Sequence, residues 1–572
     1  MNVRYNQRMF IKLTRSGGRS YVQLVESYRN EDGKPRQRSV ATLGRVDESG
    51  GGVDSLLHGL LRAKGLPASV AEPPQLAFES ALALGDVWAL DQLWKELGFD
   101  ALAGVFRKAR YTTPIEHAVR VMVFNRLCDP ESKLGVLRWL ETVSIPDVDV
   151  ESLTHQHLLR SMDALMAHPP DGVDEVLTGL LRPLVDQDLS LVFYDLTTIS
   201  AAGLSEQKDD VRQYGMSKEG LIARQFMLGV VQTAEGLPIY HEVFDGNQAE
   251  SPTLLPTLKK VLARFAHIKR LIVVADRGLL SLDNMEELAK IKLPGGQALE
   301  FILAVPGRRY GEFAEVLKSF QAKIGTASKE IIDETRWQGL RLVVAHHPER
   351  AKEQTELRRE RIAALQEKAN QWAGKLDGQE AGAKARGRKL SDSGAKARLY
   401  HEVCDAHLAR IVKVDLKSEL FTYTVDEQAL AQAELMDGKL LLVTNVADLA
   451  PSEVVQRYKA LADIERGFRV LKSEIEIAPV FHRLPDRIRA HAMLCFMALI
   501  VYRVMRHRLK LAKSDLSPEK ALAQLRRIQR NSVSINQTIP ISGISIINTQ
   551  QAGVLAALNL KKPTQDTQIS LL

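Results

Sequence analysis

Residues 189–195 read LSLVFYD, a near-continuous apolar and aromatic run that ends in an acidic residue, Asp195. Such a run is typical of a strand that is buried on both faces of a sheet. A second run of this kind, KRLIVVADRG at residues 269–278, ends its apolar part at Asp276. We predict that both aspartates stand at the carboxyl ends of buried strands, where open α/β sheets place their ligands. The alternative is that each aspartate only caps a turn.

The segments around these two strands predict a mixed sheet. The stretches at residues 224–232 and 237–244 are separated by the turn sequence TAEG and are expected to pair as a hairpin. Helical periodicity covers residues 251–266 and 281–290, and a further buried strand is expected at 299–306. The predicted order is strand, strand, strand, helix, strand, helix, strand. This order indicates a meander at one side of the sheet and crossover helices at the other.

Composition predicts a soluble protein in a reducing compartment. The chain has 572 residues with 45% hydrophobic and 26% charged residues, which is ordinary for a globular protein. Its cysteines, Cys128, Cys404 and Cys495, lie far apart and suggest neither disulfides nor a zinc site. The N-terminal sequence lacks the apolar core of a signal peptide, and the run AMLCFMALIVY is too short to span a bilayer of about 30 Å. We therefore expect no membrane partner and a cytoplasmic protein.

Positive charge is concentrated near the C-terminal third of the chain. Residues 451–513 contain 13 Lys and Arg against 6 Asp and Glu, an excess of +7 that equals the net charge of the whole chain. A basic concentration of this kind is the expected footprint of a contact with a phosphate backbone, although many basic patches are only solvated.

Composition along the chain predicts an α/β protein with several parts. A small β-sheet is expected at 1–48, a linker at 49–74 and a helical domain, a candidate for DNA binding, at 75–187. The mixed-sheet core is expected at 188–306 and 439–510, interrupted by an α+β insertion at 307–438 and followed by a C-terminal region at 511–572. The charge run at 349–396, inside the insertion, is most simply a solvated helical hairpin.

A third carboxylate lies in RYKALADIERGFRVLK, residues 457–472. Read as one helix, this stretch places Ile464, Leu461, Phe468 and Leu471 on an apolar stripe, with Tyr458, Glu465, Arg469 and Lys472 on a second stripe beside it. Read alone, Glu465 would only form a surface ion pair with Arg469, worth about 0.2–0.5 kcal/mol.

Together with the two strand aspartates, Glu465 is a candidate for a metal-binding role. Three acidic residues at one sheet edge would repel one another unless a cation neutralises them. Oxygen ligands without a His or Cys cluster favour Mg²⁺ or Mn²⁺. A pair of such ions suits phosphodiester chemistry, in which one activates the attacking oxygen and the other stabilises the leaving oxygen. We therefore predict that Asp195, Asp276 and Glu465 are metal ligands and catalytic residues.

The motifs resemble those of the DDE transposases of bacterial insertion sequences, in the IS4-related superfamily and its IS1634-like branch. FYDLTT at 193–198 and VVADRG at 273–278 are similar to the segments that carry the first two acids. HEVFDGNQAES at 241–251 is similar to the Gly-Asn segment that the family has between these two acids. LLVTN at 441–445 is similar to the family's Thr-Asn strand before the final helix. This resemblance implies a ribonuclease H-like core. The family signature Y-x2-R-x3-E-x6-K matches Tyr458, Glu465 and Lys472, but Leu461 stands where the family has Arg.

The resemblance also implies DNA contacts. Tyr458 and Lys472 are expected to contact phosphates near the cleaved end, and Arg469 is our hypothesis for the replacement of the missing Arg. Arg277 follows the second acid and is expected to touch DNA or to form an ion pair. Family members stack a tryptophan of the insertion on a flipped base, and Trp337 or Trp372 would do so here, unless they only pack.

These observations predict a transposase that binds terminal inverted repeats, hydrolyses the DNA ends with two Mg²⁺ or Mn²⁺ ions and joins the 3′-hydroxyl ends to target DNA. The resemblance implies a homodimer that bridges two ends, a hairpin intermediate as one excision route, and a bacterial protein that associates with the nucleoid. One alternative is a catalytically decayed or domesticated DNA-binding relative. The other is a carboxylate-metal nuclease or phosphohydrolase.

Overall fold

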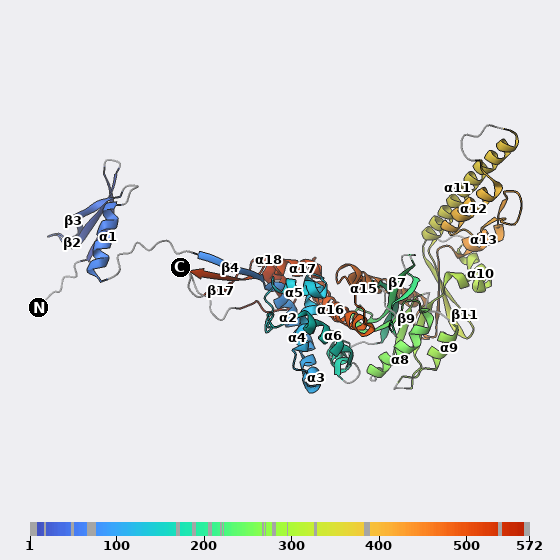
Figure 1. Ribbon diagram of the computed structural model, residues 1–572, viewed down its shortest axis with the longest axis horizontal. Coiled ribbons are helices and arrows are strands. Elements are labelled where there is room, and N and C mark those ends of the chain that lie inside the picture. The colour runs from blue at the N-terminus through green and yellow to red at the C-terminus, as the bar shows by residue number, and fades with distance from the viewer. Residues whose placement is uncertain are drawn as a thin grey trace. The chain divides into compact units, whose positions relative to one another are not determined.

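A computed structural model describes residues 8–16, 19–46, 51–65, 76–167, 172–185, 190–203, 207, 209–217, 220, 222–265, 268, 270–276, 282–293, 296–324, 329–382, 389–535 and 540–564 (Figure 1). The chain forms two compact units. One comprises Met1–Ala81 with Asn531–Gly543, and the other comprises Leu82–Arg530 with Ile544–Leu572.

The predicted N-terminal sheet is confirmed. It contains β1 (Arg8–Ser16), β2 (Arg19–Arg29) and β3 (Pro35–Val46), which pair antiparallel in the order β1-β2-β3. Its second turn is closed locally, because Gly33 has a φ of 76° and Asn30 Oδ1 accepts a hydrogen bond from the Lys34 backbone N–H at 2.9 Å. A second sheet has the order β17-β16-β4, with strands β4 (Leu76–Ala83), β16 (Gln529–Ile535) and β17 (Ile541–Ile544).

The prediction of a linker at 49–74 is wrong over part of its length. Helix α1 (Gly51–Ala63) lies there. Its leucines recur at 56, 57, 60 and 61, which is the spacing of an amphipathic helix. The glycines at its start made the segment look like a flexible linker in the sequence.

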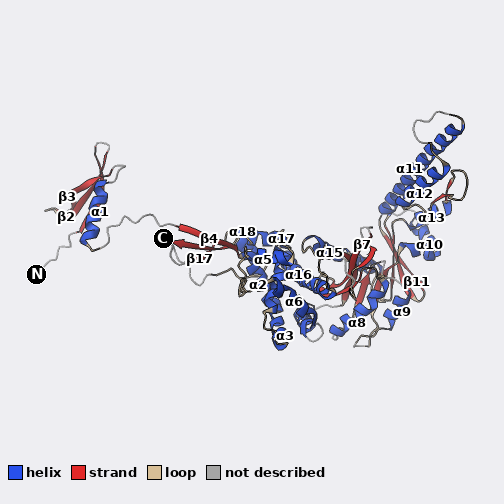
Figure 2. Ribbon diagram, in the orientation of Figure 1, coloured by secondary structure: helices blue, strands red, loops and turns tan. Residues whose placement is uncertain are grey.

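Helices build the part of the second unit that precedes the large sheet, as predicted (Figure 2). They are α2 (Gly85–Leu97), η1 (Phe99–Ala101), α3 (Leu102–Lys108), α4 (Ile115–Cys128), α5 (Lys133–Leu140), α6 (His155–Ala167) and α7 (Asp174–Val185). Helix α4 is buried along its length and carries Arg120, which forms an ion pair with Asp91 of α2 at 2.6 Å. The C-terminal helix α17 (Pro518–Leu525) packs against α2 and α4, and α18 (Thr549–Ala557) packs against α17.

The large mixed sheet has the strand order β11-β12-β15-β10-β9-β5-β7-β6, with β8 paired to β7. Its strands in the first part of the core are β5 (Leu191–Ser200), β6 (Gln213–Met216), β7 (Ile222–Thr233), β8 (Pro238–Asp245), β9 (Ile272–Ala275) and β10 (Glu300–Ala304). Strands β5, β9 and β10 are parallel, while β7 and β8 form the predicted antiparallel hairpin. The crossover helices are η3 (Ser251–Thr253), α8 (Leu254–Arg264) and α9 (Leu282–Lys290).

The segment predicted as an insertion contributes strands to this sheet. After η5 (Gly307–Phe313) and α10 (Ala314–Ile324), strands β11 (Ile331–Trp337) and β12 (Leu340–His346) pair antiparallel, and β12 pairs with β15 (Lys439–Thr444). Outside the sheet lie α11 (Pro348–Glu380), α12 (Asp392–Asp405), β13 (Val412–Val414), β14 (Tyr423–Val425) and α13 (Glu427–Met436).

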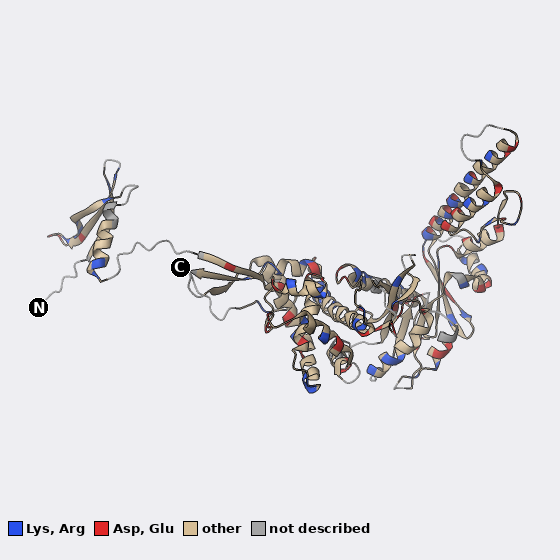
Figure 3. Cartoon of the chain, in the orientation of Figure 1, with Lys and Arg blue, Asp and Glu red and all other residues tan. Residues whose placement is uncertain are grey.

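The long helices α11 and α12 form a hairpin with its own small core. Ile362 and Leu365 of α11 are buried with Leu399 and Val403 of α12. Figure 3 shows Lys and Arg interspersed with Asp and Glu along both helices. The charge run therefore covers the solvated faces of two packed helices, which agrees with the interpretation of this segment from its sequence.

Three helices follow β15: α14 (Pro451–Lys459), α15 (Ala462–Ser473) and α16 (Pro485–Leu511). Helix α16 contains the apolar run that we judged too short to span a membrane, yet it extends over 27 residues. By length and composition it is a candidate membrane span, and 94% of its apolar window is buried inside the protein. It packs against α4, α6 and β8, which is the position of a core helix.

Candidate active site

The parallel pairing of β5 and β9 brings two of the predicted acids together. Tyr194 of β5 is registered with Ala275 of β9, so the next residues along the two strands are Asp195 and Asp276. Neighbouring strands lie about 4.8 Å apart, and registered residues of parallel strands point to the same face of the sheet. The two aspartates are therefore side by side where β9 ends.

The expectation that Asp195 ends its strand is wrong. β5 continues to Ser200 and stays paired with β7, where Asp195 is opposite Val230. The residues after Asp195 are Leu, Thr, Thr and Ile, and β-branched side chains favour continuation of the strand. Asp276 does lie directly after β9. The acids share one position because β9 is short, rather than because both strands end.

Asp195 is held in a mostly buried position. The residue is only 8% exposed, and its Oδ1 accepts a hydrogen bond from the Leu196 backbone N–H at 2.7 Å. The neighbouring Tyr194 points into the core, where its hydroxyl donates to Thr253 Oγ1 at 2.8 Å and burial raises its pKa. A buried carboxylate is costly unless it is paired or binds a metal ion. This environment therefore suits a cation ligand.

Tyr458 reaches the site from α14. Its hydroxyl donates a hydrogen bond to Asp276 Oδ1 at 2.7 Å. Helix α14 crosses the sheet over β9, β10, β11 and β12, which brings this tyrosine to the end of β9. In the sequence Tyr458 was placed on the same helix stripe as Glu465. In the structure it contacts a different predicted acid, Asp276.

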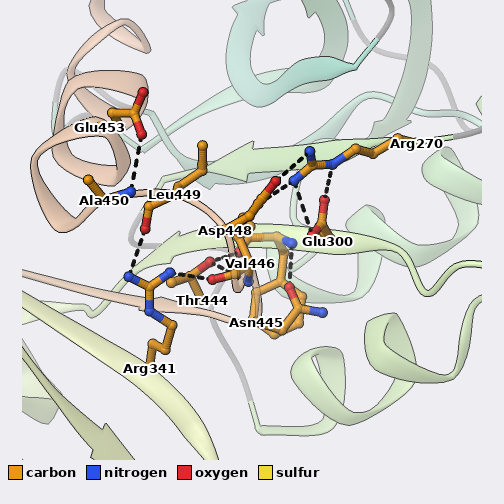
Figure 4. Close-up of polar contacts among 11 residues, drawn as sticks. Arg270, Glu300, Arg341, Thr444, Asn445, Val446, Asp448, Leu449, Ala450 and Glu453 are labelled. Atoms are coloured by element: carbon orange, nitrogen blue, oxygen red, sulfur yellow. Dashed lines mark hydrogen bonds and ion pairs between the residues drawn. The ribbon is translucent and has the colours of Figure 1, made fainter.

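The turn that leads into α14 is tied to β10 by side chains that mimic a strand (Figure 4). Asn445 accepts a hydrogen bond from the Phe301 N–H at 2.8 Å and donates to the Leu299 carbonyl at 2.9 Å. Thr444 Oγ1 donates to the Phe301 carbonyl at 2.6 Å. This geometry gives the Thr-Asn pair of LLVTN a physical role, which is to extend the β10–β15 pairing by one step.

Arginines hold the same turn from both sides (Figure 4). The guanidinium of Arg270 forms ion pairs with Glu300 at 2.7 Å and Asp448 at 2.6 Å, and these carboxylates raise the pKa of Arg270. Arg341 donates to the carbonyls of Val446 and Leu449, the latter at 2.8 Å. These arginines carry no local sequence signal, because their partners lie 30 to 178 residues away along the chain.

The stretch 457–472 is not one continuous helix. Helix α14 ends at Lys459 and α15 begins at Ala462, with a turn at Ala460 and Leu461 between them. The apolar stripe is confirmed at Leu461, Phe468 and Leu471, which are all buried. Leu461 therefore serves the core, which explains physically why no cationic side chain is accommodated there.

Glu465 lies on α15, and its side chain, like that of Ile464, is outside the described part of the structure. The backbone of α15 lies against β5, the strand of Asp195. At Gly467 the helix also lies close to β7 and α16, because an added Cβ would meet Gln232 Nε2 of β7 at 2.7 Å and Arg503 Nη2 of α16 at 2.9 Å. The helix that carries Glu465 is thus placed next to the strand that carries the first acid.

The predicted DNA contacts differ in their surroundings. Arg469 is exposed and forms no side-chain hydrogen bond or ion pair with the residues that the structure describes, and Lys472 is half-buried. Trp337 packs on Phe313, with ring centroids 4.9 Å apart, and Trp372 packs on the small core of the α11–α12 hairpin. These contacts favour packing roles for both tryptophans. Arg277 lies outside the described residues.

The two described acids fit a divalent metal ion. Adjacent carboxylates on rigid strands supply the hard oxygen ligands that Mg²⁺ and Mn²⁺ prefer. Within the described side chains, no group of three or more His, Cys, Asp or Glu residues gathers at one point. The described pair would need a third ligand, and Glu465 is the residue predicted to supply it.

Two segments of the chain match known families. Residues 186–501, more than half of the chain, match the transposase DDE domain, and residues 11–71 match the N-terminal domain of the IS1634 family transposases. The chain belongs to the IS1634 family of DDE transposases. No curated protein matches the sequence.

Family membership explains the arrangement of the site. The DDE domain implies a ribonuclease H-like core, and the mixed sheet of this transposase, with three parallel strands beside an antiparallel hairpin, has the expected form. It also implies divalent metal use, DNA binding and DNA transposition. The aspartates at the end of β9 are the candidate metal ligands of that chemistry.

Proposed function

We propose that this transposase binds the terminal inverted repeats of its insertion sequence, hydrolyses the DNA at their ends and joins the freed 3′-hydroxyl groups to target DNA. The observation that carries this proposal is the register of β5 and β9, which sets Asp195 beside Asp276. Supporting it, Tyr458 binds Asp276 and α15 lies against β5.

Asp195, Asp276 and Glu465 would hold the metal ions, two Mg²⁺ or Mn²⁺. When bound, these ions activate the attacking oxygen and stabilise the leaving oxygen. The protein contributes position and charge. The strand backbones fix the two aspartates, and the Tyr458 hydroxyl fixes the Asp276 carboxylate in one orientation. The basic residues of 451–513 would hold the DNA phosphates, with Tyr458, Lys472, Arg469 and Arg277 nearest the cleaved end.

Strand transfer adds requirements on assembly. Joining two ends to one target calls for two active sites, so we propose a homodimer on DNA. A hairpin intermediate is one route of excision that this site would support. We propose that the transposase works in the cytoplasm of a bacterium, bound to the nucleoid.

One experiment tests the function. The purified transposase is incubated with Mg²⁺ and DNA that carries the inverted repeats flanking its own gene, beside the variants Asp195→Asn and Asp377→Asn. Asp377 is an exposed acid on α11 and serves as the control for loss of one negative charge. We expect cleavage at the repeat ends by the wild type and Asp377→Asn, and none by Asp195→Asn.

Other outcomes identify the alternatives. Binding of the repeats without any cut by the wild type would indicate a catalytically decayed relative. Hydrolysis without regard to the repeat sequence, or of small phosphoesters, would indicate a nuclease or phosphohydrolase.

A further inference from the structure

The N-terminal sheet carries a second concentration of positive charge in its sequence. Residues 8–46 contain nine Lys and Arg against three Asp and Glu, an excess of +6 in 39 residues. This excess nearly equals the net charge of +7 of the entire chain. A polyanion is therefore the expected partner of this unit as well as of residues 451–513.

The pairing register divides the side chains of this sheet between its two faces. Lys12, Gln23 and Thr42 are direct cross-strand neighbours and so lie on one face. Lys12 Nζ donates to Gln37 Oε1 at 2.9 Å, and Gln23 Nε2 donates to Thr42 Oγ1 at 3.4 Å. We call these four residues the polar cluster. Lys12, Gln37 and Thr42 are exposed, and Gln23 is half-buried.

The side chains of the polar cluster are of the types that read base edges. Lysine binds the O6 and N7 acceptors of guanine, glutamine binds adenine in bidentate fashion, and threonine binds either base or the thymine methyl group. The cluster's two hydrogen bonds lie at the surface and join its side chains to each other, so they can be exchanged for bonds to a ligand at little cost.

The dimensions of the sheet match a DNA groove. Three strands spaced about 4.8 Å apart present a face about 10 Å wide, and the major groove of B-DNA is about 12 Å wide. Exposed Arg19 and Arg45 share this face, because Arg19 and Tyr21, the partner of Arg45, stand four and two residues before Gln23 on β2; Arg15 and Arg36 lie on the opposite face. A face of base-reading side chains bordered by arginines has the distribution expected for contact with bases and flanking phosphates.

We propose that the N-terminal sheet binds double-stranded DNA through this face, with the polar cluster toward the base edges and the bordering arginines toward the phosphates. The proposal rests on the proposed function for the identity of the duplex, which is the terminal inverted repeat. It assigns sequence recognition to a β-sheet, whereas the sequence had suggested the helices of 75–187 as candidates.

The opposite face favours a different kind of partner. Met9, Ile11 and Leu13 of β1 alternate onto that face and are 57%, 61% and 68% exposed. An apolar row of this kind suits a protein surface, such as a second copy of the chain. Because the base-reading side chains are on the polar face together with Arg19 and Arg45, DNA is the partner proposed there, and self-association is an outcome that the experiment must separate.

The test measures DNA affinity of the full-length transposase by fluorescence anisotropy, with the repeat duplex and a scrambled duplex of equal length. The double variant Lys12→Ala/Gln23→Ala should lose at least tenfold in affinity for the repeat and most of its preference over the scrambled duplex. Thr42→Val keeps a β-branched side chain and so preserves the strand, and it should lose threefold or more of that preference.

The matched control is Lys34→Ala, which removes one positive charge from the exposed turn before β3. It should leave the preference for the repeat unchanged, because phosphate contacts carry no sequence information. Equal preference in all variants and the wild type would overturn the proposal. A change in the sedimentation of Lys12→Ala/Gln23→Ala without a change in DNA affinity would also overturn it, and would mark the face as an interface between copies.

The two proposals fail in different ways. If the wild type prefers the repeat through this face but never cuts it, the proposed catalytic function fails and the sheet assignment stands. If the wild type cuts at the repeat and Asp195→Asn does not, while the sheet variants bind normally, only the sheet assignment fails.

Discussion

Tyr458 links the helix α14 to the acids through one hydrogen bond, its hydroxyl donating to Asp276 at 2.7 Å. A hydrogen bond to a charged group is worth about 1.5–3 kcal/mol. We therefore predict that Tyr458→Phe lowers the rate of repeat-end cleavage by about tenfold or more, since a factor of ten corresponds to about 1.4 kcal/mol. Single-turnover cleavage at saturating DNA measures this effect.

The control for this substitution is Tyr423→Phe. Tyr423 lies on β14 and donates only a long hydrogen bond, 3.5 Å, to Asn370. It should cleave at the wild-type rate. Equal rates for Tyr458→Phe and Tyr423→Phe would show that the Asp276 contact has no part in catalysis.

Lys133, at the start of α5, is a buried amine whose stability effect has a predictable sign. Burial first and the neighbouring Arg126 guanidinium second lower the pKa of Lys133 from 10.5 to about 7. The unfolded chain therefore binds more protons than the folded chain between pH 7 and 10.5, so this residue makes stability rise with pH in that window. At pH 7 the buried amine costs stability.

We predict that Lys133→Met raises the free energy of unfolding at pH 7 by roughly 1–4 kcal/mol, since each pKa unit corresponds to about 1.4 kcal/mol. The gain should shrink toward pH 10, because the wild-type amine is then largely neutral in the folded state. Urea unfolding at pH 7, 8.5 and 10 measures it, with Lys108→Met, an exposed lysine on α3, as the control. A gain that is equal at all three pH values would contradict the prediction.

At the scale of elements, α14 is fixed to the sheet by the turn before it. Arg270 precedes β9 and binds Asp448 in that turn, so one side chain couples the strand that leads to Asp276 with the helix that carries Tyr458. The pair is partly exposed, and exposed ion pairs contribute about 0–1 kcal/mol. We therefore expect this ion pair mainly to fix the position of α14 relative to β9, with little effect on the free energy of unfolding.

We predict that Arg270→Gln lowers cleavage several-fold while DNA affinity and overall stability change little. Amide hydrogen exchange should become faster in residues 445–459. Arg359→Gln is the control, because Arg359 forms a similar exposed ion pair with Glu434 in the insertion. Unchanged exchange and unchanged cleavage in Arg270→Gln would rule out the anchoring role.

Elements with strong periodicity could be predicted from the sequence, and their ends could not. The buried strands β5 and β9 and the β7–β8 hairpin were predicted, because apolar runs and turn residues mark them locally. The extension of β5 past Asp195 accompanies its pairing with β7, and the helices on either side of the break at Ala460 each pack against the large sheet. These are tertiary effects that a residue's neighbours in sequence do not reveal.

The site itself was partly predictable for the same reason. Asp195 and Asp276 were identified because each follows an apolar run, whereas their adjacency depends on the register of two strands about 80 residues apart. Arg270 and Arg341 were missed, because their partners come from distant segments and arginine has no local pattern that marks it. Thr444 and Asn445 stood out in the sequence only through the family resemblance of LLVTN. Their hydrogen bonds to β10 give these two residues a structural role.

At the scale of the whole molecule, excess positive charge is concentrated in two segments of the chain, residues 8–46 and 451–513. If both contact DNA, the logarithm of affinity should fall linearly with the logarithm of salt concentration, with a slope of about −0.9 for each phosphate contact. We predict that replacing one exposed arginine in either segment, such as Arg45 or Arg469, by alanine reduces the slope by about one unit. Titrations between 50 and 300 mM salt measure it, and a flat response would contradict the electrostatic account.

The claim that Asp195 and Asp276 hold the metal is tested most directly by Mn²⁺ binding to the transposase on repeat-end DNA, followed by electron paramagnetic resonance. We predict that Asp195→Asn and Asp276→Asn each weaken Mn²⁺ binding at least tenfold, while Asp377→Asn binds as the wild type does. Wild-type Mn²⁺ affinity in both aspartate variants would contradict the account, because the two carboxylates that the strand register brings together would then not be the ligands.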